Sequence, residues 1–422
     1  LILTPVGSEV KRFAGYRPPG QYLKQLDITD TLERVSRLDP EEYTAVLEKL
    51  REIERYAAVM PATAIKKLET LDGHASHNPG VAGIWERIVW TQAYKKDFDG
   101  TLASLRHLAL EGPGLNPYVY LEIFSRIRPN SEQIVTIEET VKDIAGKAEK
   151  EKAADLLIGF SAFQASNGEL DAAEETASMA IRKAPRHGES WLNLAMVAML
   201  KGDLEKALTG IGKAEKREST RQRASALKAM VEKHQGRLSK AEEILAPFRG
   251  QDGIEEIEDM AKVLGDWFEK NEKLTEAGTA HWLVANLEPE EPEALNEYGM
   301  ALIKANGNME EAIDILENAK NLVKEDGMGA HIWDSLAWAH YKKGDIAGAL
   351  EAITESTSLS GGVPMNEEVT FHRGAIFAGL GLDALARENL ERVASDSEPE
   401  PDDDSLGAQA YRELEKLSKK AE

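Results

Sequence analysis

The order of apolar and polar residues predicts helices along most of the chain. Trp191, Leu194 and Ala198 recur at the three- and four-residue spacing that places side chains on one face of a helix. Gly202 follows this run, at a place where a residue in the left-handed conformation commonly ends a helix. Asp203 and the residues after it open a second amphipathic run. The pattern therefore predicts a helical hairpin with a tight turn at Gly202.

This hairpin pattern recurs seven times, with an alanine at the same place in each copy and spacings of 34 to 37 residues. Five residues before the alanine stands a glycine in six of the seven copies. Because the two small residues stay in phase, we expect the alanine to lie where the two helices approach most closely. The alanines are Ala173, Ala207, Ala241, Ala277, Ala312, Ala349 and Ala386, and the residues before them are Gly168, Gly202, Gly236, Glu272, Gly307, Gly344 and Gly381.

The repeat and the composition around it predict an all-α protein, an α-solenoid in which each hairpin buries its apolar face against its neighbours. The expected organisation is an extended segment and first helix over 1–39, degenerate helical repeats over 40–153, seven regular repeats over 154–395, an acidic link over 396–405 and a capping helix over 406–422.

The hairpins resemble the tetratricopeptide repeat family over residues 154 to about 395. The family pattern of Trp, Leu, Gly or Ala, an aromatic residue, Gly, Ala and Pro carries the likeness. It is matched by Trp191-Leu194-Ala195-Gly202-Ala207, Leu264-Gly265-Phe268-Ala277-Pro289, Tyr298-Gly299-Gly307-Ala312, Trp333-Leu336-Ala337-Gly344-Ala349 and Gly374-Phe377-Gly381-Ala386. The resemblance implies a right-handed superhelix of helix-turn-helix repeats. Glu272 departs from the pattern at one turn.

The closing repeats, residues 294–393, resemble tetratricopeptide proteins of the bacterial cell envelope, including components of polysaccharide export and outer-membrane assembly. The run 331–338 (HIWDSLAW) carries most of this likeness. It implies a periplasm-facing location, with the cytoplasm as the alternative. The apolar start at Leu1 fits the remnant of a membrane anchor or signal upstream, and it fits an arbitrary chain boundary equally well.

Composition and motifs narrow the classes of function. The 422 residues carry a net charge of −23, which disfavours wholesale binding of nucleic acid. There is no cysteine, so disulfides, thiolate metal sites and cysteine nucleophiles are excluded. The sequence holds no phosphate loop, dinucleotide fingerprint or zinc-protease motif. His74 and His77 offer two metal ligands without a third, so we expect no metal site there. Because these motifs are absent, we also expect neither an enzyme nor a bound cofactor.

The resemblance also implies which side chains face a partner, because the second, fifth, ninth, twelfth and thirteenth residues of each first helix line the groove in this family. Methionine and aromatic side chains there supply adaptable and rigid contact area for a peptide. The alternative is that neighbouring helices or a cap bury them. The expected partner-binding residues are Leu192, Met196, Met199, Arg223, Met230, Asn296, Met300, His331, Trp338, Tyr341 and Phe371, and Lys233 and His234 occupy further groove positions.

Charge supplies a second hypothesis. Residues 201–249 hold 12 basic and 7 acidic residues, whereas residues 251–330 hold 6 and 20. The basic strip 201–249 would attract an anionic polymer, although such a run is more often a solvated face. Aromatic residues are not interleaved there, so nucleic acid is not expected. A third hypothesis makes the chain the regulatory part of a larger enzyme.

Chaperone-binding members of this family hold a carboxylate terminus with a clamp of lysine, asparagine and arginine. Asn193 and Arg223 match two of its places. Ile158, Ala162 and Leu227 occupy the others. The incomplete clamp predicts that this chain does not recognise a chaperone tail.

Overall fold

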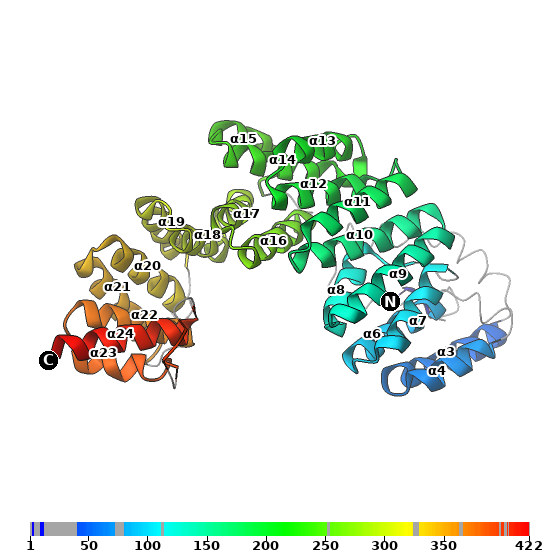
Figure 1. Ribbon diagram of the computed structural model, residues 1–422, viewed down its shortest axis with the longest axis horizontal. Helices are drawn as coiled ribbons and strands as arrows, with labels where there is room; N and C mark the ends of the chain where they lie inside the picture. The colour runs from blue at the N-terminus through cyan, green and yellow to red at the C-terminus, as the bar shows by residue number, and fades with distance from the viewer. Residues whose placement is uncertain are drawn as a thin grey trace. The chain divides into compact units, whose positions relative to one another are not determined.

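The computed structural model describes residues 2–3, 9–11, 40–71, 80–110, 114–250, 254–323, 329–362, 366–395, 398–400, 403 and 405–421. Within these residues the chain is built of α-helices joined by short connections (Figure 1). The all-α helical repeat solenoid expected from the sequence is confirmed. The expected first helix before residue 40, the His74 and His77 pair, and half of the acidic link 396–405 lie outside the described residues.

One short pair of strands precedes the helices, which the all-α expectation did not include. Strand β1 (Ile2–Leu3) pairs antiparallel with β2 (Glu9–Lys11). The chain divides into two compact units, Leu1–Leu227 and Lys228–Glu422. This division falls within the array of seven repeats, and the domain boundaries expected from the sequence remain predictions.

The first unit consists of helices that pack as hairpins on their neighbours in the chain. They are α3 (Pro40–Val59), α4 (Pro61–Glu69), α6 (Gly80–Tyr94), α7 (Phe98–Leu110), α8 (Pro117–Ile127), α9 (Ser131–Lys147), α10 (Lys150–Ser166), α11 (Leu170–Lys183), α12 (Gly188–Lys201), α13 (Leu204–Ala214), the short η1 (Glu218–Thr220) and the start of α14 (Arg221–His234). Local signals set their starts: Asn116 accepts the Tyr118 N–H before α8, and Asn130 forms a capping box with Gln133 at α9.

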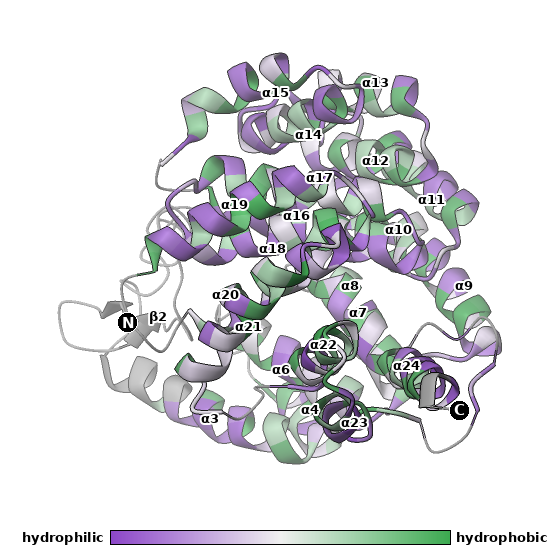
Figure 2. Cartoon of the chain, turned by 90° about the vertical axis from the view of Figure 1, so that its left-hand side faces the viewer, coloured by the Kyte–Doolittle hydropathy of each residue, from purple (hydrophilic) through white to green (hydrophobic). Residues whose placement is uncertain are grey.

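The second unit continues with the same arrangement. Its helices are the rest of α14, α15 (Leu238–Leu245), the short η2 (Ala246–Phe248), α16 (Glu255–Lys270), α17 (Leu274–Leu287), α18 (Pro292–Lys304), α19 (Met309–Leu322), α20 (Ala330–Lys343), α21 (Ile346–Leu359), α22 (Glu367–Gly379), α23 (Asp383–Leu390) and α24 (Leu406–Ala421). Helix α24 packs against α22 and α23. Many helices carry hydrophobic residues on one face and hydrophilic residues on the other (Figure 2).

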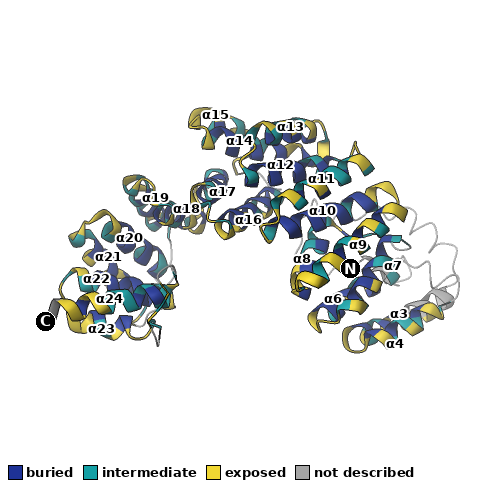
Figure 3. Cartoon of the chain, in the orientation of Figure 1, coloured by how far each residue is buried: buried dark blue, intermediate teal, exposed yellow. Residues whose placement is uncertain are grey.

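The repeated alanines form the buried centre of each hairpin. Each of the seven has at most 1% of its surface exposed, within the buried faces seen in Figure 3. Glycine allows a still closer approach at one crossing, because a Cβ added at Gly210 of α13 would lie 2.9 Å from the carbonyl oxygen of Trp191 on α12. The small residues therefore stand where helices meet, as their phase in the sequence predicts.

The turns between paired helices use the left-handed backbone conformation. Gly202 has φ 82°, and its N–H donates to the carbonyl of Met199 while the next N–H donates to that of Ala198. The same pair of hydrogen bonds recurs at each of the seven turns and satisfies the carbonyl groups at the helix end. Glu272 adopts φ 59° at the equivalent place, which for a residue with a Cβ costs roughly 1–2 kcal/mol.

One predicted turn residue is wrong by one position. The left-handed residue between α18 and α19 is Asn306, with φ 48°, and not Gly307. The Asn306 N–H donates to Ile303 and the Gly307 N–H to Leu302, so the turn closes one residue early. The connection to α19 is correspondingly one residue longer. Asparagine tolerates this conformation better than most residues, which is why the turn forms without glycine.

Two carboxyl groups in these hairpins have pKa values well above their ordinary range. Burial, followed by repulsion from Glu189 and Glu151, raises the pKa of Asp155 to about 7. Burial and the neighbouring Glu288 raise the pKa of Glu258 to about 7. The folded chain thus holds these protons at pH values where the unfolded chain, ionising near about pH 4, has lost them.

We expect Ala207→Leu to lower the free energy of unfolding by about 1–3 kcal/mol, because the larger side chain overpacks the contact between α12 and α13. Thermal unfolding followed by circular dichroism measures the loss. Ala58→Leu is the matched control, since Ala58 is exposed on α3 and should tolerate the same change. Equal stability of Ala207→Leu and the wild type would contradict the assigned crossing.

The raised pKa of Asp155 predicts a stability that depends on pH. The protonated Asp155 carboxyl makes its full contribution to the free energy of unfolding below about pH 4. This contribution is lost as the pH rises to about 7, because the carboxyl ionises more easily in the unfolded chain. Asp155→Asn should therefore flatten the fall in melting temperature between these values. Asp171→Asn is the control, because Lys201 lowers the pKa of Asp171 and its titration lies below this window. An unchanged pH profile in Asp155→Asn would refute the assignment.

Candidate protein-binding site

Most residues predicted to line a groove are buried between helices. The first helices of successive hairpins contact one another, α10 with α12, α18 with α20 and α20 with α22. The expectation of exposure is wrong for the eight that have 8% or less of their surface exposed: Leu192, Met196, Met199, Arg223, Met230, Asn296, Trp338 and Phe371. Met300, His331 and Tyr341 are partly exposed. Contact of any of these residues with a partner remains a prediction.

Arg223 and Asn193, which match two places of the chaperone clamp, are held by partners within the first unit. Arg223 donates from Nη1 to Oε2 of Glu189 at 3.1 Å and from Nη2 to Oε1 of the same carboxylate. Asn193 donates from Nδ2 to Oγ of Ser161 at 2.9 Å, and that hydroxyl donates to the carbonyl of Ala173 at 2.8 Å. The side chains of Arg223 and Asn193 therefore form hydrogen bonds between neighbouring hairpins.

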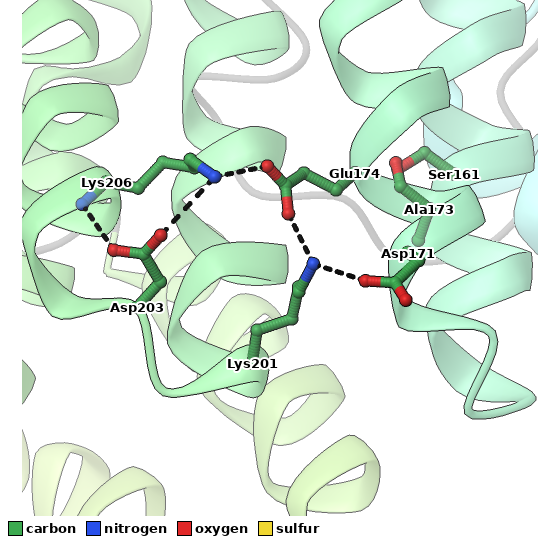
Figure 4. Close-up of polar contacts among 7 residues, drawn as sticks. All are labelled: Ser161, Asp171, Ala173, Glu174, Lys201, Asp203 and Lys206. Atoms are coloured by element: carbon green, nitrogen blue, oxygen red, sulfur yellow. Dashed lines mark hydrogen bonds and ion pairs between the residues drawn. The ribbon is translucent and has the colours of Figure 1, made fainter.

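The basic strip 201–249 also contributes ion pairs to neighbouring hairpins (Figure 4). Lys201 Nζ lies 2.6 Å from Oδ1 of Asp171 and 2.6 Å from Oε2 of Glu174. Lys206 pairs with the other oxygen of Glu174 and lies 3.3 Å from Oδ2 of Asp203. These hydrogen bonds from Lys201 and Lys206 lower the pKa of Glu174. The charges of Lys201 and Lys206 are thus balanced by carboxylates nearby.

A similar cluster lies at the end of α14. The buried carboxylate of Glu232 accepts from Nε of Arg237 and, at 2.8 Å, from Nζ of Lys240. These two hydrogen bonds lower the pKa of Glu232 to about 2. The cluster fixes the turn between α14 and α15 rather than presenting bare cations to a polymer.

The aromatic residues of the last repeats form a packed cluster. The Trp338 ring stacks on His372 with 4.2 Å between ring centres and on Tyr341 with 5.2 Å. Phe371 meets the same indole edge-on at 5.7 Å. His372 Nδ1 lies 2.8 Å from a carboxylate oxygen of Asp334, and both side chains are buried. Within the second unit this cluster joins α20 to α22, which explains why Trp338 and Phe371 are not available on the surface.

A cavity of about 220 Å³ lies beside Lys233 in the second unit. It is lined by residues of α14, α17, α18 and the turn after α18: Lys233, His234, Thr275, Gly278, Thr279, Tyr298, Ala301, Leu302, Ala305 and Gly307. Lys233 and His234 are groove positions that the family resemblance implied. The small residues of α17 and α18 leave the space open, because their short side chains do not fill it.

The Lys233 ammonium is enclosed by aromatic and hydroxyl groups. It lies 5.3 Å from the centre of the Trp282 ring and 5.6 Å from that of Tyr298. Its Nζ donates to the Tyr298 hydroxyl at 3.1 Å, and that hydroxyl donates to Oε1 of Glu311 at 2.8 Å. Glu311 is 3.9 Å from Nζ. The site thus presents one cation on a defined hydrogen-bonded chain.

Burial controls the protonation of this site. Desolvation lowers the pKa of Lys233, and the nearby carboxylates of Glu311 and Glu242 oppose that shift. Desolvation also raises the pKa of Tyr298, and its hydrogen bond to Glu311 adds to the shift. The phenol therefore stays a donor, and a desolvated ammonium such as that of Lys233 is stabilised further by a second anion.

Sequence reasoning missed three of the groups around Lys233. Tyr298 was assigned only to the consensus of its own repeat, and Trp282 and Glu311 were not considered. The Nζ of Lys233 bonds to a residue 65 positions further along the chain. The signals that pointed to this region were the groove positions of Lys233 and His234 and the tyrosine at the aromatic consensus place of its repeat.

The described residues also limit the chemistry of the chain. No group of three or more His, Asp or Glu side chains among them is placed to hold a metal ion. His187 lies 3.6 Å from Asp155 and 3.4 Å from Ser190, but Ser190 is fully buried and no substrate can reach its hydroxyl. No helix in the described ranges combines the length and the apolar character needed to cross a membrane.

One family model and several solved structures are similar to this chain. No curated protein matches the sequence. Among solved structures, this chain is similar to a chain of the APC/C Cut9–Hcn1 hetero-tetramer, with 16% identity, a TM-score of 0.34 and coverage of 84% of this chain and 58% of that one. It is also similar to yeast Tom70, with 16% identity, a TM-score of 0.37 and coverage of 95% and 88%.

A third similar structure is YrrB, described as a TPR protein with an unusual peptide-binding site, with 16% identity, a TM-score of 0.28 and coverage of 52% of this chain and 92% of YrrB. The family model of the tetratricopeptide repeat matches residues 164–223. This match identifies residues 164–223 as tetratricopeptide repeats, and buried alanines and left-handed turns recur in the same phase in the hairpins between Lys150 and Leu390.

Proposed function

We propose that the chain is a non-catalytic scaffold that binds a protein or peptide partner, and that the cavity beside Lys233 receives a carboxylate of that partner. The observation that carries the proposal is the desolvated ammonium between the rings of Trp282 and Tyr298, next to an open volume of about 220 Å³. That volume admits a side chain or a chain terminus. The family match supports a protein-interaction role.

A carboxylate suits this cavity better than a neutral group. Burial lowers the pKa of Lys233, so the charged form gains when a second anion approaches it. The Lys233 ammonium and the Thr279 hydroxyl, which donates to the carbonyl of Thr275 at 3.2 Å, are polar groups on the wall. The surrounding sequence 251–330 is strongly acidic, so a ligand with a single carboxylate fits better than a polyanion.

The anionic-polymer hypothesis receives less support, because Lys201, Lys206, Arg223, Arg237 and Lys240 of the basic strip are paired with carboxylates. The role of regulatory part of a larger enzyme stays an alternative. We further propose that the scaffold works in a bacterial envelope assembly or polysaccharide-export complex on the periplasmic side. The resemblance of residues 294–393 to envelope proteins supports that setting, and fractionation of cells followed by immunoblotting tests it.

We expect a random-peptide library selected on the purified chain to enrich peptides with an acidic side chain or a free carboxylate terminus. Lys233→Met should weaken the selected peptides about tenfold or more, equivalent to about 1.4 kcal/mol, because the ammonium is lost while the stem is kept. Fluorescence polarisation measures the affinity. Lys262→Met is the matched control, since Lys262 is exposed on α16. Uncharged selected peptides, or full affinity in Lys233→Met, would overturn the proposal.

A further inference from the structure

Three turns of the first unit bring apolar and basic side chains to one surface. We name this surface the basic turn edge, formed by Val59, Met60, Tyr94, Lys95, Lys96, Arg126 and Arg128. Lys95 Nζ donates to the carbonyl of Val59, which joins the α3–α4 turn to the α6–α7 turn. The Arg126 guanidinium lies 4.7 Å from the centre of the Tyr94 ring, which joins the α8–α9 turn. These two contacts join the three turns, and Met60, Lys96 and Arg128 lie within two residues of the contacting residues along the chain.

The apolar members of the basic turn edge are unusually exposed. Val59, Tyr94 and Met60 have 64%, 62% and 52% of their surface exposed. Among the large hydrophobic residues that the structure describes, only Val135, at 55%, is similarly exposed. Exposed apolar side chains gathered in one place mark an interaction surface.

Two basic residues of the basic turn edge lie in a strained backbone conformation. Lys96 has φ 56° and Arg128 has φ 50°, whereas five of the seven later turns use glycine at the left-handed place and the other two use Glu272 and Asn306. A residue with a Cβ is disfavoured in this conformation, so the two turns keep basic side chains against their local preference. Glycine would relieve this strain, so the side chains of Lys96 and Arg128 are kept at a cost in backbone energy.

The charge of the basic turn edge is opposite to that of the chain as a whole. Residues 94–96 and 126–128 carry four basic side chains and no carboxylate, in a chain with a net charge of −23. The next acidic residue, Asp97, accepts the Gly100 N–H at 3.1 Å at the start of α7. The surface thus combines three exposed apolar side chains with four cations.

We propose that the basic turn edge binds the surface of a membrane that contains anionic phospholipids. Lysine and arginine near such a surface are attracted to its headgroups, and tyrosine favours the boundary between headgroups and acyl chains. Side chains that project from turns enter this boundary without needing a shaped pocket. An acidic protein would instead need a matching recess for each of Val59, Met60 and Tyr94, so the observations favour the lipid surface.

Sedimentation of the full chain with vesicles tests this inference. We expect binding to vesicles of phosphatidylcholine with about a third phosphatidylglycerol, weaker binding as salt is raised, and little binding to phosphatidylcholine alone. The double variant Lys96→Gly with Arg128→Gly should bind about tenfold more weakly, because two cations are removed. The same variant should melt at a higher temperature, which shows that it is folded and that strain has been relieved.

Glu272→Gly is the matched control, because it relieves the same strain at a turn of the second unit and should leave vesicle binding unchanged. Tyr94→Ala tests the apolar contribution and should also weaken binding. Three results would overturn the inference: no sedimentation with anionic vesicles at low salt, equal sedimentation with neutral vesicles, or wild-type binding by the double glycine variant. Binding of polyglutamate without binding of vesicles would replace the lipid with an acidic protein. The assay is independent of the cavity beside Lys233.

Discussion

The contact between the two helices of each hairpin, made over an alanine, is the constraint on which the rest of this structure depends. Ala207 and its six equivalents have almost no exposed surface, so each crossing is already filled. A methyl group there lets the helix backbones approach closely, and a larger side chain would separate them. Because each hairpin is stabilised mainly by its neighbours, a defect at one crossing weakens the contacts on both sides of it.

Close packing between successive first helices has a second consequence, which concerns where a partner can bind. Met196 and Trp338 stand at groove positions of the family, yet helix contacts and aromatic stacking bury both. Lys233 differs, because the residues opposite it on α17 and α18 include Gly278 and Ala301, which leave a cavity. Available surface therefore depends on the size of the facing side chains as much as on the position within the repeat.

The sequence predicts the fold well because its signals are local and periodic. The phase of Ala207 and Gly202 follows from helix geometry and turn conformation within a single hairpin, and the structure agrees. Asn306 shows the limit of this reasoning, since either it or Gly307 can close the turn and the choice depends on the whole connection. The contact of Lys233 with Tyr298 joins residues 65 positions apart in different hairpins, so the spacing within one repeat carries no signal for it.

The turns between helices accept larger side chains than the helix crossings do. A side chain at the left-handed position points into open space, as at Gly202 and Gly344, where an added Cβ would meet no atom within 4 Å. Packing therefore does not select the residue there, and only the backbone preference of roughly 1–2 kcal/mol acts against a side chain. That preference is small enough to be outweighed by a useful contact. Lys96 and Arg128 keep long basic side chains at such positions, so the surface chemistry of this solenoid is set at its turns while its fold is set at its crossings.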